Sequence, residues 1–548
     1  MSLRKRGLAS GALLLAGALA LTACSSGGSS DSSSSGGTDG TGGTFSFGLE
    51  KFQALTPSNC YDLYCAQVNK ALFTGLFEFT TDDAGALVAT PTELTKAVST
   101  PDKGKTWEIQ LNEGFTFTNG EKVTAQTFID TYNYAANGDN GQQLGFIFGP
   151  GSLDVEGYAD VADGKTKEMS GLKAKDEYTL QITLNAAMTE SLFKNFITGP
   201  QVLPMPSEAF KDPEKYEKQP IGNGPYMMDG PYSNQGLTVS KNPNYAGTAS
   251  SADKIEFKIY ADSNAYWADL QANTLDVTNN LPQNALATAS SVLGDRFINT
   301  PDGLQYSFFG FPANDDTFKE MDVRVGIAKS INWEEINQKL YYGTRQTATS
   351  FAPKTIPGGG EDVCGDKCSF DAAKAKQLID DAGGVPGNTV RIPQLSNETG
   401  DVQKAICNQI QTNTGVTCTV EIFKDFGEML DVTQAGKAPA GTLVGSGWVA
   451  DNPTIQNMIY FFFTSDSPGN VAQYKNPEFD KLLQEGVQAT DEATQIAKWQ
   501  EAEKVLYEDF PAWAYQFRNQ VGGYSTNVSN VAISPDGLVD LDVITVNS

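Results

Sequence analysis

Strand and helix patterns alternate along the chain from Thr44 onward, and this alternation most constrains the fold. Alternating apolar positions predict strands over Trp107–Leu111 and Tyr178–Leu184. Helical spacing predicts helices over Ala66–Leu76 and Thr124–Ala136, the second with Thr124 as its N-cap. The roughly 500 residues of this body exceed what one hydrophobic core holds. We therefore predict an α/β protein of two or three domains.

The N-terminal segment is typical of an export signal. Three basic residues at positions 4–6 precede the uncharged run Gly7–Leu21, which is too short and too rich in Ala and Gly to span a membrane comfortably. The run ends in LTAC at Cys24, which resembles a bacterial lipobox whose cysteine thiol is diacylated and becomes the new N-terminus after cleavage. An ordinary signal with a cysteine at this position by chance is the alternative. We expect residues 1–23 to be removed and the Gly/Ser-rich residues 24–43 to form a flexible tether.

Charge and the lack of histidine exclude several function classes. The net charge of −27 opposes binding to nucleic acid. Without histidine, the chain offers no Ser-His-Asp or Cys-His catalysis, no HExxH zinc site and no imidazole metal ligand. A hydrolase that uses two carboxylates stays possible on composition alone. We expect a monomer with no cofactor and no metal.

Six cysteines after Cys24 fall into three close pairs. In an oxidising compartment the simplest pairings of the fifteen possible are 60–65, 364–368 and 407–418. The residues concerned are Cys60, Cys65, Cys364, Cys368, Cys407 and Cys418. The 407–418 bridge would join a helix to the strand that follows it. Metal binding by the 364–368 pair is the alternative.

Eight segments between Leu72 and Asp480 carry a family resemblance. They read LFTGLFE from Leu72, WEIQLNEGFTFTNGEKVTA from Trp107, IGNGPY from Ile221, KNPNY from Lys241, LDVTNNLP from Leu275, DVRVGIA from Asp322, GWVADNP from Gly447 and YKNPEFD from Tyr474. In this order they resemble the oligopeptide- and dipeptide-type solute-binding proteins of ABC importers, extracellular solute-binding family 5. The second segment and its continuation depart from the family pattern at Thr118, Asn119 and Thr127.

The resemblance implies a two-lobed periplasmic-binding-protein fold, in the large peptide-binding variant. This variant has an extra subdomain inserted in lobe 1 and a ligand cleft between the lobes. The expected boundaries are 44–79, 198–302 and 515–548 for lobe 1, 80–197 for the inserted subdomain and 303–514 for lobe 2. Phe146 and Phe148, in the inserted subdomain, are expected to pack.

The resemblance also implies a function in transport. The chain would capture peptides in the cleft, where the peptide lies like an added strand, and deliver them to ABC transporter permease subunits. Lipid on Cys24 would hold it on the extracytoplasmic face of the cell membrane. An oligosaccharide or another solute is the alternative ligand within the same fold. A secreted two-carboxylate hydrolase is the alternative from another class.

Four ligand-binding candidates come from matched motifs. Asp451 matches the family aspartate that pairs with the ammonium of the ligand, although Asp-Asn-Pro-Thr is also suitable N-cap chemistry for a helix. Trp448 matches a tryptophan that lines the family cleft, with a core position as the alternative. Asn279 and Asn280 match a loop that meets the ligand, with a turn before Pro282 as the alternative.

Five further candidates surround these positions. Tyr306 and Phe308 lie in an alternating strand, so core packing competes with ligand contact. Ser446 and Gly447 would allow a ligand close to the backbone. Asn59 begins a segment that is expected to contribute backbone groups to the cleft.

Overall fold

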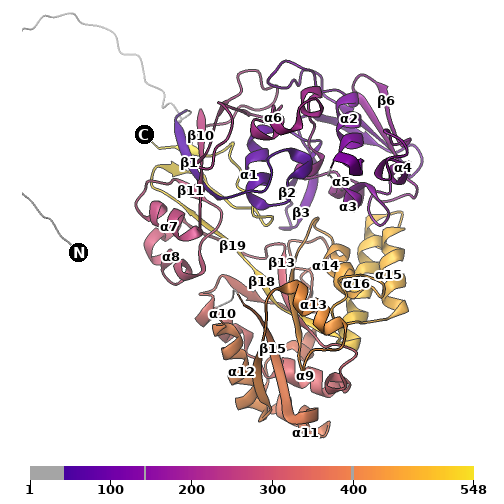
Figure 1. The fold of residues 1–548 in the computed structure, drawn as a ribbon, viewed down its shortest axis with the longest axis vertical. Coiled ribbons are helices and arrows are strands. Elements are labelled where there is room, and N and C mark those ends of the chain that lie inside the picture. The colour runs from indigo at the N-terminus through magenta and orange to yellow at the C-terminus, as the bar shows by residue number, and fades with distance from the viewer. Residues whose placement is uncertain (1–41, 141–143, 397–399, 548) are drawn as a thin grey trace, which may run out of the picture. The chain divides into compact units, whose positions relative to one another are not determined.

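The computed structural model describes residues 42–547, except 141–143 and 397–399. The predicted signal, Cys24 and most of the predicted tether lie outside this part of the chain. Among the described residues, no helix combines the length and apolar character needed to cross a membrane. Helices and strands are mixed throughout, as the α/β prediction requires (Figure 1).

A seven-stranded mixed sheet draws its strands from distant parts of the sequence. Its order is β12 (Phe297–Thr300), β19 (Gln520–Tyr524), β11 (Val277–Thr278), β1 (Thr44–Glu50), β10 (Lys254–Tyr260), β9 (Gly236–Lys241) and β8 (Tyr226–Met228). The central strand β1 pairs in parallel with β10 and β11 and buries Phe45, Phe47 and Leu49. The helices α1 (Leu63–Leu72), α7 (Ser263–Gln271) and α8 (Leu286–Leu293) contribute apolar faces to its cores.

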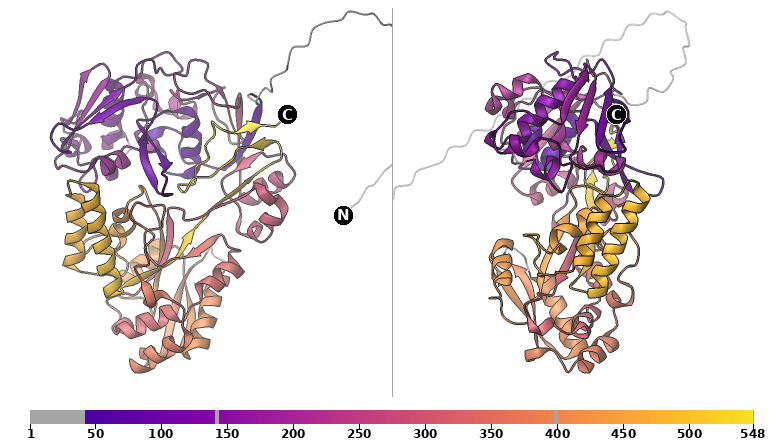
Figure 2. Two further views of the ribbon diagram at one scale, coloured as in Figure 1. Left: turned by 180° about the vertical axis from the view of Figure 1, so that it is seen from behind. Right: turned by 90° about the vertical axis from the view of Figure 1, so that its right-hand side faces the viewer.

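A second, antiparallel sheet has four strands. Its order is β14 (Arg345–Thr347), β18 (Ala512–Arg518), β13 (Gln305–Gly310) and β17 (Val444–Val449), so β17 is an edge strand. The strand pair β15 (Thr389–Leu395) and β16 (Thr417–Phe423) lies nearby in the sequence. The accompanying helices are α9 (Met321–Lys329), α10 (Trp333–Leu340), α11 (Ala372–Asp381), α12 (Asp401–Thr414), α13 (Phe426–Gln434), α14 (Ile455–Phe463), α15 (Pro477–Val487) and α16 (Glu492–Asp509). The last two pack side by side (Figure 2).

A third sheet occupies the stretch in which we predicted an inserted subdomain. Its strands are β4 (Thr95–Ser99), β5 (Thr106–Leu111), β7 (Thr179–Thr183) and β6 (Leu172–Asp176). The helices α2 (Ala125–Ala136), α3 (Gly145–Phe148), α4 (Tyr158–Ala162) and α5 (Glu190–Phe196) belong to the same stretch, and the hairpin of β2 (Phe77–Thr81) and β3 (Leu87–Pro91) precedes it. The Trp107 indole stacks on Phe193 with ring centroids 4.5 Å apart.

Two connections link the seven-stranded sheet to the antiparallel sheet that contains β13 and β18. One runs from β12 to β13, and the other runs from β18 to β19 with only Asn519 between the strands (Figure 1). The Asn519 side chain donates a hydrogen bond to Asn299 Oδ1 at 2.9 Å and so joins β12 to the second connection.

All three predicted disulfides are present, and metal binding by Cys364 and Cys368 is therefore not supported. The predicted helix Ala66–Leu76 was placed too late: α1 starts at Leu63 because the Asp62 carboxylate caps its first turn. It ends at Leu72 because Phe73 takes an extended conformation. Thr124 is the N-cap of α2, as predicted.

Candidate functional site

The segment that follows β17 carries the first candidate carboxylate. The Ala450 N–H donates to the Leu304 carbonyl at 2.9 Å, and this bond fixes the backbone just before Asp451. Helix α14 starts four residues later, with Thr454 as its N-cap. The alternative that Asp451 caps this helix was therefore wrong, because the Thr454 hydroxyl already accepts the Asn457 N–H.

The side-chain amide of Asn457 fixes the position of the loop that contains Asp451. The side-chain oxygen of Asn457 accepts the backbone N–H of Asp451 and the indole N–H of Trp448, both at 3.0 Å. The Trp448 ring stacks on Phe461 with centroids 5.0 Å apart. Trp448 is half-buried and is not among the residues that line the pocket at Asp451, so the geometry favours a role in supporting the loop.

The Asp451 carboxylate is open to a pocket and has no cationic partner at ion-pair distance in the described part of the chain. Desolvation by the surrounding protein raises its pKa, and the hydrogen bond from the Asn457 side chain only partly offsets this. Desolvation raises the pKa of Tyr460, and the negative charge of Asp451 raises it further. A desolvated carboxylate without a partner is suited to receive a cation from a bound molecule.

The pocket at Asp451 has a volume of about 290 Å³ and is lined by segments distant in the sequence. They include the start of α1, residues around Phe146, residues 195–201, Leu304, and residues 449–460. Three of its lining side chains are large, apolar and unusually exposed: Tyr61 (51%), Phe146 (43%) and Val449 (59%). Such concave apolar surface with a few carboxylates at its wall, here Asp62, Asp451 and Asp536, is typical of a binding site for a small molecule or peptide.

Sequence reasoning missed Tyr61 and Val449 and expected Phe146 to pack. Phe148 is fully buried as expected. Phe146 points to a different side of the short helix α3, and its ring centroid lies 6.1 Å from that of Tyr61. Val449 follows Trp448 by one residue in a strand, so strand alternation was a usable signal that it faces the other side.

Two aromatic candidates lie in the core. Tyr306 and Phe308 have no exposed surface and share one face of β13. The Tyr306 hydroxyl donates to the Met458 carbonyl at 2.7 Å, and the Phe308 ring packs on Phe462. The packing alternative therefore describes both positions.

The two asparagines have separate surroundings. Asn279 is buried, and its side-chain amide donates to the Gly537 carbonyl at 2.9 Å. This bond fixes the backbone at Gly537, whose neighbours Asp536 and Leu538 line the pocket. Asn280 donates to the Tyr64 hydroxyl at 3.4 Å. Neither asparagine lines the pocket itself.

The remaining candidates supply backbone. Gly447 is exposed on the edge strand β17, and a Cβ there would meet the Tyr306 carbonyl oxygen at 2.8 Å, so the strand requires glycine. Ser446 pairs with Phe308 in the same ladder. Asn59 ends a short 3₁₀ turn, and the pocket wall begins at the next residue, Cys60.

Comparisons with known proteins agree with one another. Residues 91–470 match the model of the bacterial extracellular solute-binding proteins, family 5 Middle. The chain is 25% identical to the dipeptide-binding protein DppE of Bacillus subtilis over 448 residues, 80% of each chain. It is 23% identical to the periplasmic murein peptide-binding protein MppA of Escherichia coli, over 85% of this chain and 86% of that protein. The unliganded open form of an MppA murein tripeptide-binding protein superposes with a TM-score of 0.78 at 19% identity, over 93% of this chain and 99% of that one.

Proposed function

Because the chain belongs to the bacterial extracellular solute-binding proteins of family 5, we propose that it captures peptides in the pocket at Asp451 and delivers them to an ABC transporter permease. The fold is the two-lobed α/β fold of periplasmic peptide-binding proteins. Proteins of this family are binding proteins for transport and not enzymes, which removes the hydrolase alternative.

The observation that carries the proposal is the Asp451 carboxylate, which has no cationic partner among the residues that the structure describes. A peptide brings an ammonium at its N-terminus, and burying that charge without a partner is costly. Asp451 supplies the partner four residues before α14 begins, and the ion pair offsets the cost of desolvating both charges. The relatives named for dipeptides and murein peptides support a peptide over other solutes.

Edge strand β17 supplies the second element of peptide recognition. Residues just before β17 pair with Arg391 of β15, and beyond them no strand of the described sheet lies on the outer side of β17. An extended peptide adds there as a further strand. Glycines at 445 and 447 let β17 pack closely against its neighbours, because a Cβ at Gly447 would meet the Tyr306 carbonyl oxygen at 2.8 Å. Backbone pairing is independent of side-chain identity, which suits a receptor that accepts many peptide sequences.

The sheets support the predicted division into lobes. All strands of the seven-stranded sheet fall within 44–79, 198–302 and 515–548, and β4–β7 fall within 80–197. Strand β18 crosses the expected boundary at residue 514, since it continues to Arg518 in the antiparallel sheet. We place the end of lobe 2 at Arg518 and the second connection at Asn519.

We also propose that acylated Cys24 anchors the protein on the outer face of the cytoplasmic membrane. The basic start, the apolar run and the LTAC sequence support this. Expression of the Cys24→Ser variant beside the wild type, with labelled fatty acid in the medium, tests it. Label and membrane association are expected for the wild type alone; equal labelling of both forms contradicts the anchor.

The test of the ligand class is native mass spectrometry of the full chain as purified, followed by sequencing of any released molecule. Intact short peptides are expected, and Asp451→Asn is expected to retain much less of them. The exposed Asp381→Asn variant controls for loss of one charge. Release of an oligosaccharide that both variants retain equally would instead identify the ligand as a sugar. The exposed rings of Tyr61 and Phe146 would then be its stacking surface.

A further inference from the structure

The pocket at Asp451 adjoins a second chamber of about 300 Å³. Residues 198–200 and four single residues line both spaces: Ala66, Phe79, Asp536 and Leu538. The two spaces therefore meet at these residues, and a molecule bound at Asp451 lies next to the chamber. We call it the acidic chamber.

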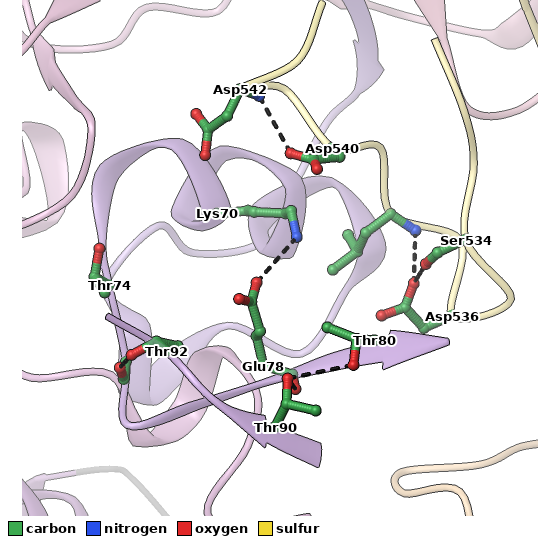
Figure 3. A network of polar contacts seen from close by, with 12 residues as sticks. Lys70, Thr74, Glu78, Thr80, Thr90, Thr92, Ser534, Asp536, Asp540 and Asp542 are labelled. Carbon is green, nitrogen blue, oxygen red and sulfur yellow. Dashed lines mark hydrogen bonds and ion pairs between the residues drawn. The ribbon is translucent and has the colours of Figure 1, made fainter. Parts of the chain in front are cut away.

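The acidic chamber carries a large excess of negative charge. Five carboxylates line it, against one cation, Lys70: Glu78, Glu93, Asp536, Asp540 and Asp542. Figure 3 shows Lys70 with Glu78 on one side and the two aspartates of the C-terminal segment, Asp540 and Asp542, on the other. The Lys70 ammonium lies 4.0 Å from Glu78, which is the limit of an ion pair.

Lys70 does not neutralise this charge. Burial raises the pKa of Asp542, and the charges of Asp540 and Glu78 raise it further, although Lys70 acts in the opposite direction. The same carboxylates act on Tyr245, whose pKa is raised to about 12 by desolvation first and then by Glu93, Asp542 and Glu78. The chamber therefore has a negative potential that a second cation would relieve.

An unsatisfied amide points independently to a missing partner. Asn69 is fully buried, and neither its side-chain oxygen nor its nitrogen has a hydrogen-bond partner among the described residues. It lies on the face of α1 that lines the chamber, together with Ala66, Lys70 and Phe73, at the spacing of one helix face. Buried amides without partners are rare and costly, so a polar group from a bound molecule is expected here.

The walls indicate the shape of that molecule. Phe73, Phe77 and Phe79 line the chamber with apolar surface beside the carboxylates. An apolar stem that ends in a cation fits this combination, because the stem packs on the rings while the head reaches the charges. Lysine and arginine side chains have this form.

We propose that the acidic chamber binds the basic side chain of a lysine or arginine in the peptide held at Asp451, and so makes the protein selective for basic peptides. This inference rests on the proposed function. Along α1, the walls of the two spaces extend from Leu63 to Phe73, a rise of about 15 Å. An extended peptide covers this distance in roughly four to five residues, so the basic residue belongs roughly at the third to fifth position.

The test is calorimetric titration of the full chain with pentaalanine and with two series of substituted pentaalanines. One series carries a single arginine at each position in turn, and the other carries citrulline, its uncharged analogue. At one of the last three positions, arginine is expected to bind about tenfold more tightly than citrulline, because only arginine makes a charge-assisted contact.

Matched variants locate the preference. In the double variant Glu78→Gln and Asp540→Asn, two exposed carboxylates of the chamber are neutralised, and the arginine preference is expected to vanish while pentaalanine binds as before. The control variant Glu214→Gln and Asp381→Asn removes the same charge from exposed positions outside the chamber and is expected to keep the preference.

Three outcomes overturn the inference and are distinguishable. Equal affinity for arginine and citrulline at every position, with pentaalanine still bound, rejects the acidic chamber and leaves the proposed function intact. Failure of every peptide to bind rejects the proposed function and the inference with it. Retention of the preference in the chamber variant also rejects the assignment to these carboxylates.

Discussion

Asn457 accepts the backbone N–H of Asp451 through its side-chain oxygen, at 3.0 Å. The same oxygen accepts the indole N–H of Trp448, so one amide in the first turn of α14 holds both the end of strand β17 and the start of the loop that follows it. The position of the proposed ammonium partner thus depends on a buried residue that lies six positions further along the chain.

Removal of the Asn457 side-chain amide should weaken peptide binding more than it lowers the stability of the fold. Asn457→Ala leaves two donors without an acceptor, at an expected cost of about 1–3 kcal/mol in the free energy of unfolding. Peptide affinity is expected to fall about tenfold, because the Asp451 loop is no longer held in place. Urea unfolding and calorimetry measure the two effects. The exposed Asn264→Ala is the matched control, and wild-type affinity in Asn457→Ala would show that the loop is held by other contacts.

Gly447 should not tolerate a side chain. In Gly447→Ala the added Cβ lies 2.8 Å from the Tyr306 carbonyl oxygen, so β17 and β13 must separate. We expect a loss of about 1–3 kcal/mol in the free energy of unfolding and weaker peptide binding. Gly230→Ala is the control, because its Cβ meets no atom within 4 Å and its φ is not positive. Equal unfolding midpoints for the two variants would contradict the prediction.

Glu503 should make the folded state less stable as pH rises. Its carboxylate accepts the Phe351 N–H at 2.6 Å, yet burial raises its pKa from 4.5 to about 7. The folded state then binds this proton more tightly than the unfolded state does, so the stabilising contribution is complete below pH 4.5 and is lost as pH rises toward 7.

The variant Glu503→Gln isolates this contribution, because an amide oxygen still accepts the Phe351 N–H without titrating. Its free energy of unfolding, relative to wild type, is expected to increase by about 2–3 kcal/mol between pH 4.5 and pH 8. Denaturant melts of both proteins across this range provide the measurement. A difference that is constant with pH would mean that Glu503 does not titrate there.

The disulfides should separate stability from binding. The bridge Cys60–Cys65 joins the pocket wall to the first turn of α1, whereas Cys407–Cys418 joins α12 to β16. Each Cys→Ser double variant is expected to lose about 2–3 kcal/mol, since both bridges close short loops. Only the 60–65 variant is expected to bind peptide more weakly. Weaker binding in both, or in neither, would contradict a local role for the first bridge.

The general fold could be predicted because its determinants are local or pairwise in the sequence. Strand alternation located β5 and β7, and the compartment together with cysteine spacing identified three disulfides. Helix starts were less predictable. The first turn of α1 depends on the Asp62 carboxylate, which accepts two backbone N–H groups, and apolar periodicity does not register such a cap.

The site was predictable only where a motif fixed its position. Asp451 was found from the GWVAD segment, but its isolation from any cation depends on which chain segments meet it. Tyr306 and Phe308 carried the same alternating signal as a cleft-lining strand, and packing against α14 decided that they face the core. The acidic chamber combines α1 with residues 536–542, a pairing across most of the chain that no local pattern encodes.

The passage from β18 to β19 also determines when the chain can fold as it is made. Strand β18 lies between β13 and β14, and β19 lies between β11 and β12, so a single late segment completes the interior of two sheets. A ribosome must therefore have synthesised residues 512–524 before either sheet closes, and the nascent chain stays without its final cores until then. Premature termination anywhere upstream leaves both sheets open along an unpaired edge, which makes truncated products targets for aggregation and proteolysis.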